Sequence, residues 1–136
     1  MVTAIDTSVL VDVLIRDPTY ATDAKACLRP AASEGSLVIC ETVLAEIAPS
    51  LEPSDIPQFL QDWGLIFLPS SQESALLAGK MFRLFLRRGG KRGRVAADFL
   101  IGAHAQTHAE RLLARDRGYY RDYFKALKVW DPTEKS

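Results

Sequence analysis

Four carboxylate side chains stand beside short apolar runs of this sequence, in positions from which they can converge. They are Asp6, Glu46, Asp98 and Asp116. If the apolar runs are parallel strands and the segments after them are helices, these acids gather at the edge where open α/β sheets bind their ligands. Converging carboxylates repel one another, and a hard divalent metal ion offsets that repulsion. The pattern therefore predicts metal-assisted chemistry.

Each acid also has a purely structural interpretation. Asp6 could cap a helix, Asp98 could be a first-turn acid that the helix dipole favours, and Glu46 could be a solvated helix residue. Asp116 could belong to a turn with Gly118. These interpretations together would leave the shared sheet edge a coincidence, so we prefer a joint site. Other acids lack such a strand-edge context and are expected on the surface, namely Asp12, Asp17, Asp23, Glu34, Glu52 and Asp62.

Strands and helices alternate along the chain. Short apolar runs predict strands at 2–5, 36–40, 65–68, 111–114 and 128–130. Helices are predicted at 9–16 before Pro18, at 20–29 before Pro30, and at 41–48, 54–63, 71–88, 95–109 and 119–127. Gly89 and Gly90 end the longest of them. This alternation predicts a three-layer α/β/α fold around a central parallel sheet of about five strands.

Composition favours an ordinary globular enzyme or binding domain. The 136 residues are 48% apolar and 25% charged, which fits one domain over 1–136 with a frayed polar tail from about residue 132. The 17 basic and 17 acidic residues cancel, so any argument for nucleic acid must be local. No apolar stretch approaches the ~20 residues of a membrane span, and the opening residues do not form a signal peptide. Cys27 and Cys40 are expected as reduced core thiols, and the protein is expected in the cytoplasm.

Four segments resemble the ordered motifs of a known family. AIDTSVLVDVL, TVLAEI, ADFLIGAHA and LLARDRGYYRDYF are similar to the motifs of PIN domains, and especially of the VapC toxins of toxin–antitoxin pairs. The resemblance spans Asp6 to Trp130. It implies a metal-dependent endoribonuclease that cuts single-stranded or loop RNA, is a homodimer, and is held inactive by a cognate antitoxin. Two departures from the family pattern, Ala114 and Gly118, leave the acids intact but the number of metal ions open.

By the same resemblance, Asp6, Glu46, Asp98 and Asp116 would surround one or two Mg²⁺ or Mn²⁺ ions, and Ser8 would steady Asp6. Such ions can activate a water, stabilise charge on the phosphoryl oxygens and assist the leaving oxygen. Asp6 and Asp116, as strand-end residues, are the strongest candidates for direct contact with metal. The helix dipole would keep Asp98 ionised.

A local basic segment supplies the positive charge that the overall balance lacks. It contains Lys80, Arg83, Arg87, Arg88, Lys91, Arg92 and Arg94. Because it leads into the helix of Asp98, we expect it near the rim of the site, with Arg87, Arg88, Lys91, Arg92 and Arg94 on RNA phosphates. A solvated helix end and a docking surface for an acidic antitoxin tail are the alternatives.

Other polar and aromatic residues near these motifs are ambiguous. His104 and His108 are spaced to bind zinc from one helix face, but the HAQTH segment lacks the glutamate of a zinc protease, so we expect a polar face on an exposed helix. Arg115 and Arg117 could contact phosphate or pair with nearby acids. The aromatic group after Gly118 could stack on RNA bases, although its helical spacing favours core packing. It consists of Tyr119, Tyr120, Tyr123 and Phe124.

Other functions remain open at this stage. A PIN-like scaffold could bind RNA or protein without cutting, and a PIN nuclease could have a housekeeping role rather than act as a toxin. An aspartate-nucleophile phosphotransferase is disfavoured, because such enzymes usually carry a second Asp where this chain has Ser8.

Overall fold

The structure, a computed structural model, describes residues 1–91 and 95–134. Its centre is a five-stranded parallel sheet in the order β3-β2-β1-β4-β5. The predicted fold class is therefore confirmed, and each predicted strand is present to within one residue at an end. The strands are β1 Val2–Ile5, β2 Ser36–Ile39, β3 Leu65–Phe67, β4 Arg111–Leu113 and β5 Val129–Trp130.

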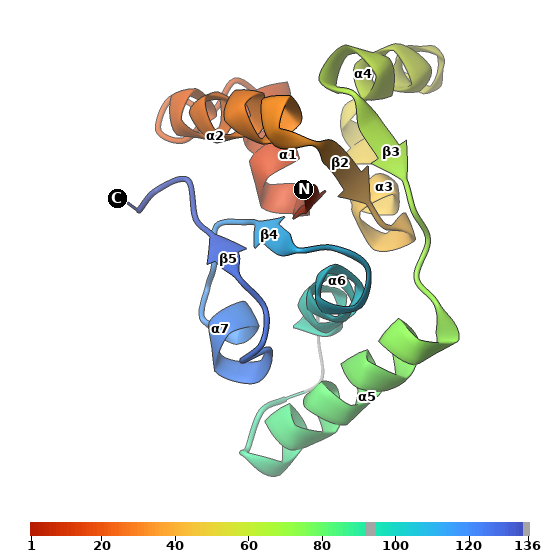
Figure 1. Ribbon diagram of the computed structural model, residues 1–136, viewed down its shortest axis with the longest axis vertical. Coiled ribbons are helices and arrows are strands. Elements are labelled where there is room, and N and C mark those ends of the chain that lie inside the picture. The colour runs from red at the N-terminus through yellow and green to blue at the C-terminus, as the bar shows by residue number, and fades with distance from the viewer. Residues whose placement is uncertain (92–94, 135–136) are drawn as a thin grey trace.

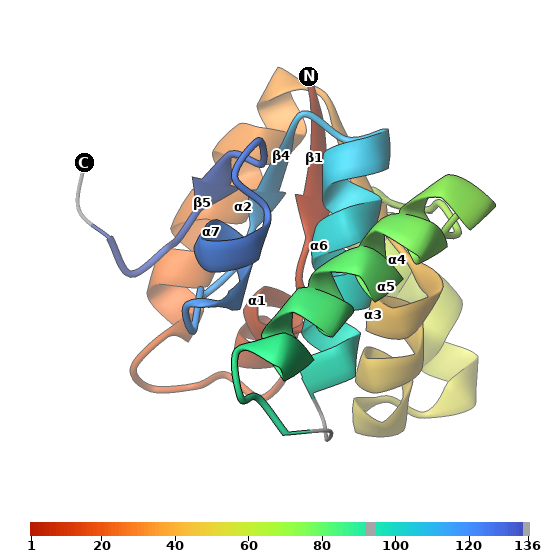
Figure 2. The same cartoon turned by 90° about the horizontal axis from the view of Figure 1, so that it is seen from below.

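Helices cover both faces of the sheet. Figure 1 shows α1 and α2 on one side, and α6 with α5 packed outside it on the other. In Figure 2, α5 crosses the outer side of α6. The helices are α1 Thr7–Leu14, α2 Ala21–Glu34, α3 Glu41–Ile47, α4 Ile56–Trp63, α5 Gln72–Arg87, α6 Val95–His108 and α7 Tyr119–Tyr123, with short 3-10 turns η1 Ala48–Ser50 and η2 Pro53–Asp55.

Helix α6 is the central element of its layer. Its side chains from Ile101 to Ala105 are buried on every side, as expected of a helix held between a sheet and a second helix. Gly102 allows α7 to approach, because a Cβ there would lie 2.5 Å from the Phe124 ring. The placement of Asp98 thus follows from a helix that packing fixes firmly.

Several helix ends differ from the sequence prediction, and α7 in particular ends at Tyr123 rather than at residue 127. Helix α2 continues through Pro30 to Glu34. Pro30 and Ala26 are both exposed, so the backbone carbonyl that loses its partner there can face water. Helix α1 ends at Leu14, before Pro18, in a turn where Arg16 has a φ of 53°.

Both cysteines, Cys27 and Cys40, are buried free thiols, as predicted. In the two stretches that the structure describes, no helix has the length and apolar character needed to cross a bilayer.

Candidate active site

A pocket of about 290 Å³ lies at the carboxyl edge of the sheet, where the sequence predicts the acids to converge. The four predicted acids and Ser8 all line it. Asp6 follows β1 and Asp116 lies just beyond the neighbouring strand β4, while Glu46 comes from α3 and Asp98 from the first turn of α6. The remaining lining residues are Thr7, Arg115, Arg117, Tyr119 and Tyr120.

Asp6 is the least exposed residue of the four acids, at 6%. Its backbone N–H donates to the Leu113 carbonyl at 3.0 Å, and its carboxylate accepts the Ser8 N–H as the cap of α1. The Ser8 hydroxyl donates to the same carboxylate at 2.6 Å, and the Tyr120 hydroxyl donates at 2.8 Å. Burial raises the pKa of Asp6, while these hydrogen bonds act to lower it. Asp6 is thus a helix cap and part of the pocket wall at the same time.

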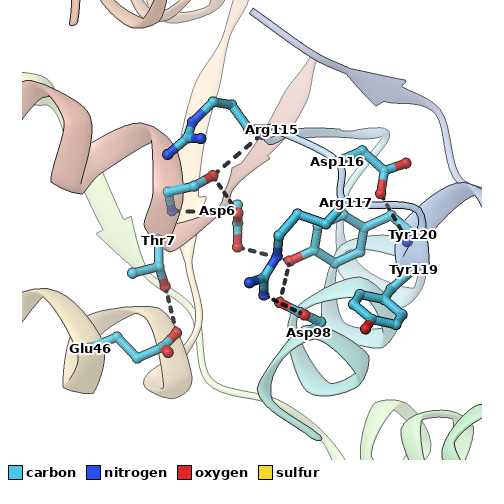
Figure 3. A pocket seen from close by; sticks show the side chains of 10 residues that line it. Asp6, Thr7, Glu46, Asp98, Arg115, Asp116, Arg117, Tyr119 and Tyr120 are labelled. Atoms are coloured by element: carbon cyan, nitrogen blue, oxygen red, sulfur yellow. Dashed lines mark hydrogen bonds and ion pairs between the residues drawn. The ribbon is translucent and has the colours of Figure 1, made fainter. Parts of the chain in front are cut away.

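Asp98 faces Asp6 across the Tyr120 hydroxyl (Figure 3). Its Oδ1 lies 3.5 Å from that hydroxyl, and its Oδ2 accepts a 2.9 Å hydrogen bond from Arg117. Burial raises the pKa of Asp98, Arg117 lowers it, and the negative charges of Asp6 and Glu46 raise it. The helix dipole, from which the sequence predicts an ionised Asp98, would lower this pKa. Desolvation and the neighbouring acids outweigh that effect.

Glu46 is more exposed than the other acids and reaches the pocket beside α1. Its Oε1 accepts a 2.6 Å hydrogen bond from the Thr7 hydroxyl (Figure 3). Because Thr7 directly follows Asp6, this bond ties α3 to the start of α1.

Asp116 lines the pocket, but its carboxylate is engaged by its own turn. Oδ1 accepts the backbone N–H groups of Gly118 at 2.8 Å and Tyr120 at 3.3 Å, and Oδ2 accepts that of Arg121 at 3.2 Å. Gly118 has a φ of +104°, a conformation that side-chain-bearing residues rarely adopt. This backbone conformation explains why the turn has glycine at position 118. The sequence left open whether Asp116 belongs to a turn with Gly118. In the structure, the hydrogen bonds of its carboxylate are those of such a turn.

Asp12 was predicted to be a surface charge, and this was wrong. Its residue is 3% exposed, and its carboxylate accepts two hydrogen bonds from Arg115, at 2.8 and 3.0 Å. The Arg115 guanidinium also lies over the Tyr20 ring, 4.0 Å from its centre. The backbone N–H of Arg115 donates a hydrogen bond to Ser8 Oγ at 3.3 Å. Asp12 thus supports one wall of the pocket.

Asp131 is a second supporting acid that the sequence analysis missed. It is 7% exposed, and its Oδ2 accepts the backbone N–H of Asp116 at 3.1 Å. Its Oδ1 accepts the N–H and hydroxyl of Thr133 at 2.8 and 2.6 Å. Asp131 follows β5, and its position after the last apolar run was the available signal.

The ambiguous aromatic residues pack in the core. The centre of the Phe99 ring lies 5.1 Å from that of Tyr123 and 6.2 Å from that of Phe124. Phe124 is only 1% exposed. Tyr120 is also buried, with its hydroxyl turned to the acids. Core packing, the preferred prediction, is therefore what the structure shows for these residues. Tyr119 differs because it also lines the pocket.

The two histidines do not form a polar exposed face, so that prediction was wrong. His104 is 1% exposed, and its Nε2 lies 2.6 Å from the Leu68 carbonyl oxygen. His108 Nε2 lies 2.9 Å from the hydroxyl of Ser71, the residue that caps α5. Burial lowers the pKa of His104. Both imidazoles join α6 to the segment between β3 and α5.

The basic segment lies at the end of α5 and beyond. Arg87, Arg88 and Lys91 are exposed, and the Arg88 guanidinium lies 5.2 Å from the centre of the Tyr123 ring. Arg92 and Arg94 fall outside the described residues. Contact between this segment and RNA stays a prediction.

The donor set matches a hard divalent cation in chemistry, since carboxylate oxygens of Asp6, Asp98 and Glu46 face one pocket. The arrangement is not yet a coordination shell. Within residues 1–91 and 95–134, no three acidic, histidine or cysteine side chains are placed to hold one ion. The Tyr120 hydroxyl donates a hydrogen bond to the Asp6 carboxylate, and the Arg117 guanidinium donates one to the Asp98 carboxylate.

The fold and site define the class of protein. A family profile described as the PIN domain matches residues 3–125, and the chain belongs to this family. PIN domains are nucleases and generally use divalent metal ions. Comparison with curated protein sequences gives no significant match.

Three solved structures illustrate the shared fold. The chain from DNA-bound VapBC2 of Rickettsia felis has a TM-score of 0.74 and 19% identity, with 96% of this chain and 98% of that chain covered. For DNA-bound VapBC of Salmonella typhimurium the TM-score is 0.72 at 15% identity, covering 97% and 98%. For FitAcB of Neisseria gonorrhoeae the TM-score is 0.70 at 19% identity, covering 96% and 97%.

Proposed function

We propose that this chain is a divalent-metal-dependent endoribonuclease that cleaves single-stranded or loop RNA and serves as the toxin of a toxin–antitoxin pair. The observation that carries the proposal is the pairing of Asp6 and Asp98 in one pocket, with the pKa of each raised by burial. A buried and a partly buried carboxylate that face each other gain most from a bound cation. Membership of a nuclease family makes phosphodiester hydrolysis the reaction that fits.

In this proposal Asp6, Asp98 and the more exposed Glu46 hold the metal. Asp116 is the fourth candidate ligand, but to reach an ion its carboxylate would have to release at least one of its backbone N–H partners. A divalent ion held there would lower the pKa of a bound water and stabilise charge on the phosphoryl oxygens. We propose either Mg²⁺ or Mn²⁺, in one or two copies.

The remaining pocket residues would position the acids and the substrate. Ser8 holds Asp6 by its 2.6 Å hydrogen bond, and Thr7 holds Glu46 in the same way. Arg115, fixed by Asp12, places a positive charge in the pocket wall where an RNA phosphate would approach. The basic segment that includes Arg87, Arg88 and Lys91 would bind the RNA backbone farther from the cut.

The toxin role rests on the proteins that share the fold. VapBC2, VapBC and FitAcB pair a chain of this fold with an antitoxin. We propose that this chain likewise binds a cognate antitoxin, which blocks the acidic pocket and competes there with metal. It would act in the cytoplasm and form a homodimer.

Growth after induction tests the toxin role directly. Wild-type chain expressed alone should stop growth, and co-expression of its neighbouring antitoxin gene should restore it. Asp98→Asn is the matched control, because it keeps the side-chain size and removes one candidate ligand. Equal toxicity of both chains would mean that the harm is not nuclease activity. If neither chain is toxic, a housekeeping PIN nuclease or a scaffold that does not cut RNA becomes the better account.

A further inference from the structure

Arg117 forms an ion pair with Asp98, one of the four acids that line the pocket. Arg115 instead pairs with Asp12, which supports the pocket wall. The Nη2 of Arg117 donates to Asp98 Oδ2 at 2.9 Å. The Arg117 side chain is 72% exposed, whereas that of Asp98 is 13% exposed. The guanidinium therefore reaches onto a sheltered carboxylate from the solvent side, and Figure 3 shows it beside Asp98.

The charges around Asp98 explain why a cation belongs there. The Tyr120 hydroxyl lies 2.8 Å from a carboxylate oxygen of Asp6 and 3.5 Å from one of Asp98, and Glu46 lines the same pocket, so three negative charges lie close together. The guanidinium thus offsets part of the repulsion among the acids, which is also what a divalent ion would do.

Arg117 can leave this position more easily than the other arginine of the pocket. Arg115 is held by two hydrogen bonds to the buried Asp12 and stacks on Tyr20. Among the residues that the structure describes, Arg117 has one charged partner, and its side chain lies mostly in solvent, where an ion pair contributes little to stability. Because Asp116 secures the backbone of the turn through Gly118 and Tyr120, the Arg117 side chain can swing away while the turn stays in place.

We propose that Arg117 is an internal counter-cation of Asp98, which a divalent ion must displace, so that this side chain sets the metal affinity of the site. The proposal rests on the proposed function, since it concerns the metal that the nuclease would use. Arg117 is a positioning residue here, because it acts through Asp98. Its removal should make the metal bind more tightly, the opposite of what loss of a ligand does.

The test is a calorimetric titration of metal-stripped protein with Mn²⁺ alone, without RNA. Arg117→Gln should bind Mn²⁺ about fivefold more tightly than the wild type, the upper end of what an exposed ion pair contributes. Arg117→Lys keeps the charge and should stay near the wild type. Arg29→Gln, an exposed arginine outside the pocket, controls for net charge and should also match the wild type.

A double variant shows whether the effect passes through Asp98. In an Asp98→Asn background, adding Arg117→Gln should leave the residual Mn²⁺ affinity unchanged, because the pair no longer exists. Unchanged or weaker binding by Arg117→Gln alone would overturn the inference while leaving a metal-binding nuclease. A similar gain in Arg29→Gln would also overturn it, as a general charge effect. If neither the wild type nor Arg117→Gln binds Mn²⁺, the inference and the metal dependence of the proposed function fall together.

Discussion

The hydroxyl of Tyr120, on α7, donates a 2.8 Å hydrogen bond to Asp6 at the end of β1, and both residues are buried. The two residues lie 114 positions apart, so this bond joins the last helix of the chain to its first strand inside the candidate site. Burial and the charges of Asp6 and Asp98 raise the pKa of Tyr120 well above its ordinary value of 10.0. The hydroxyl therefore stays protonated near neutral pH and can keep donating to the carboxylate.

Tyr120→Phe removes this donor and keeps the ring. We expect the unfolding free energy of metal-free protein to fall by about 1 to 3 kcal/mol, because a buried carboxylate loses a hydrogen bond. The pKa of Asp6 should rise further for the same reason. Urea denaturation of the chelator-treated protein measures the change. Tyr123→Phe, on the same helix but outside the pocket lining, is the control. Equal losses in the two variants would show that the Tyr120 hydroxyl contributes nothing special.

The raised pKa values of Asp6 and Asp98 predict a pH dependence of stability. Folding raises the pKa of both carboxyl groups above the ordinary value of 3.8 that they have in the unfolded chain. Their contribution to the stability of the folded state is complete when the pH is below the unfolded pKa. That contribution is lost as the pH rises through the raised pKa of the folded state. The contribution of these two groups to metal-free stability should therefore decline as pH increases across that window. Unfolding free energies measured between about pH 4 and 8 should decline less in Asp98→Asn than in the wild type. Parallel curves would contradict the assignment.

The buried ion pair of Asp12 should matter to stability more than any surface acid. Asp12→Ala leaves Arg115 without its partner, and we expect a loss of about 1 to 3 kcal/mol, less than for a fully buried pair because Arg115 is partly exposed. Asp23→Ala, an exposed acid on α2, is the matched control. A cycle with Arg115→Gln should show the two losses to be strongly non-additive. Additive losses would mean that the two side chains do not support each other.

The basic segment should govern the salt dependence of RNA binding. If Arg87 and Lys91 each neutralise one phosphate, replacing both with Gln should flatten the plot of log affinity against log salt by about 1.4, at ~0.7 per contact. Arg29→Gln with Lys128→Gln removes the same charge from exposed positions outside the pocket lining. Affinities for single-stranded RNA at several salt concentrations decide the matter. An unchanged slope assigns the segment to solvent or to an antitoxin.

The sheet and the meeting point of the acids could be predicted because both depend on local patterns. Short apolar runs define the strands, and parallel strands bring the residues after β1 and β4 to one edge. The role of Asp12 could not be predicted in this way. Its partner, Arg115, lies 103 residues away, and a long-range ion pair leaves no periodic signal in the sequence. The only hint was that Asp12 lies four residues after Ser8, on the same helix face.

The errors at α2 and at the histidines have a common cause. By residue type alone, Pro30 predicts the end of a helix and His104 predicts a polar group on an exposed face. Pro30 is tolerated because its face of α2 is exposed, and His104 can lie buried because its imidazole hydrogen-bonds with the Leu68 carbonyl. Both outcomes depend on tertiary surroundings that residue type alone does not specify.

Cleavage of a single-stranded RNA, with and without metal, tests the central claim most directly. Wild-type protein should cut with Mg²⁺ or Mn²⁺ and stop when a chelator is added. Asp6→Asn and Asp98→Asn, shown by circular dichroism to be folded, should each lower the rate at least about a hundredfold, the scale on which loss of one electrostatic contact in an active site is felt. Cleavage by both variants at the wild-type rate, or undiminished cleavage in chelator, would contradict the account.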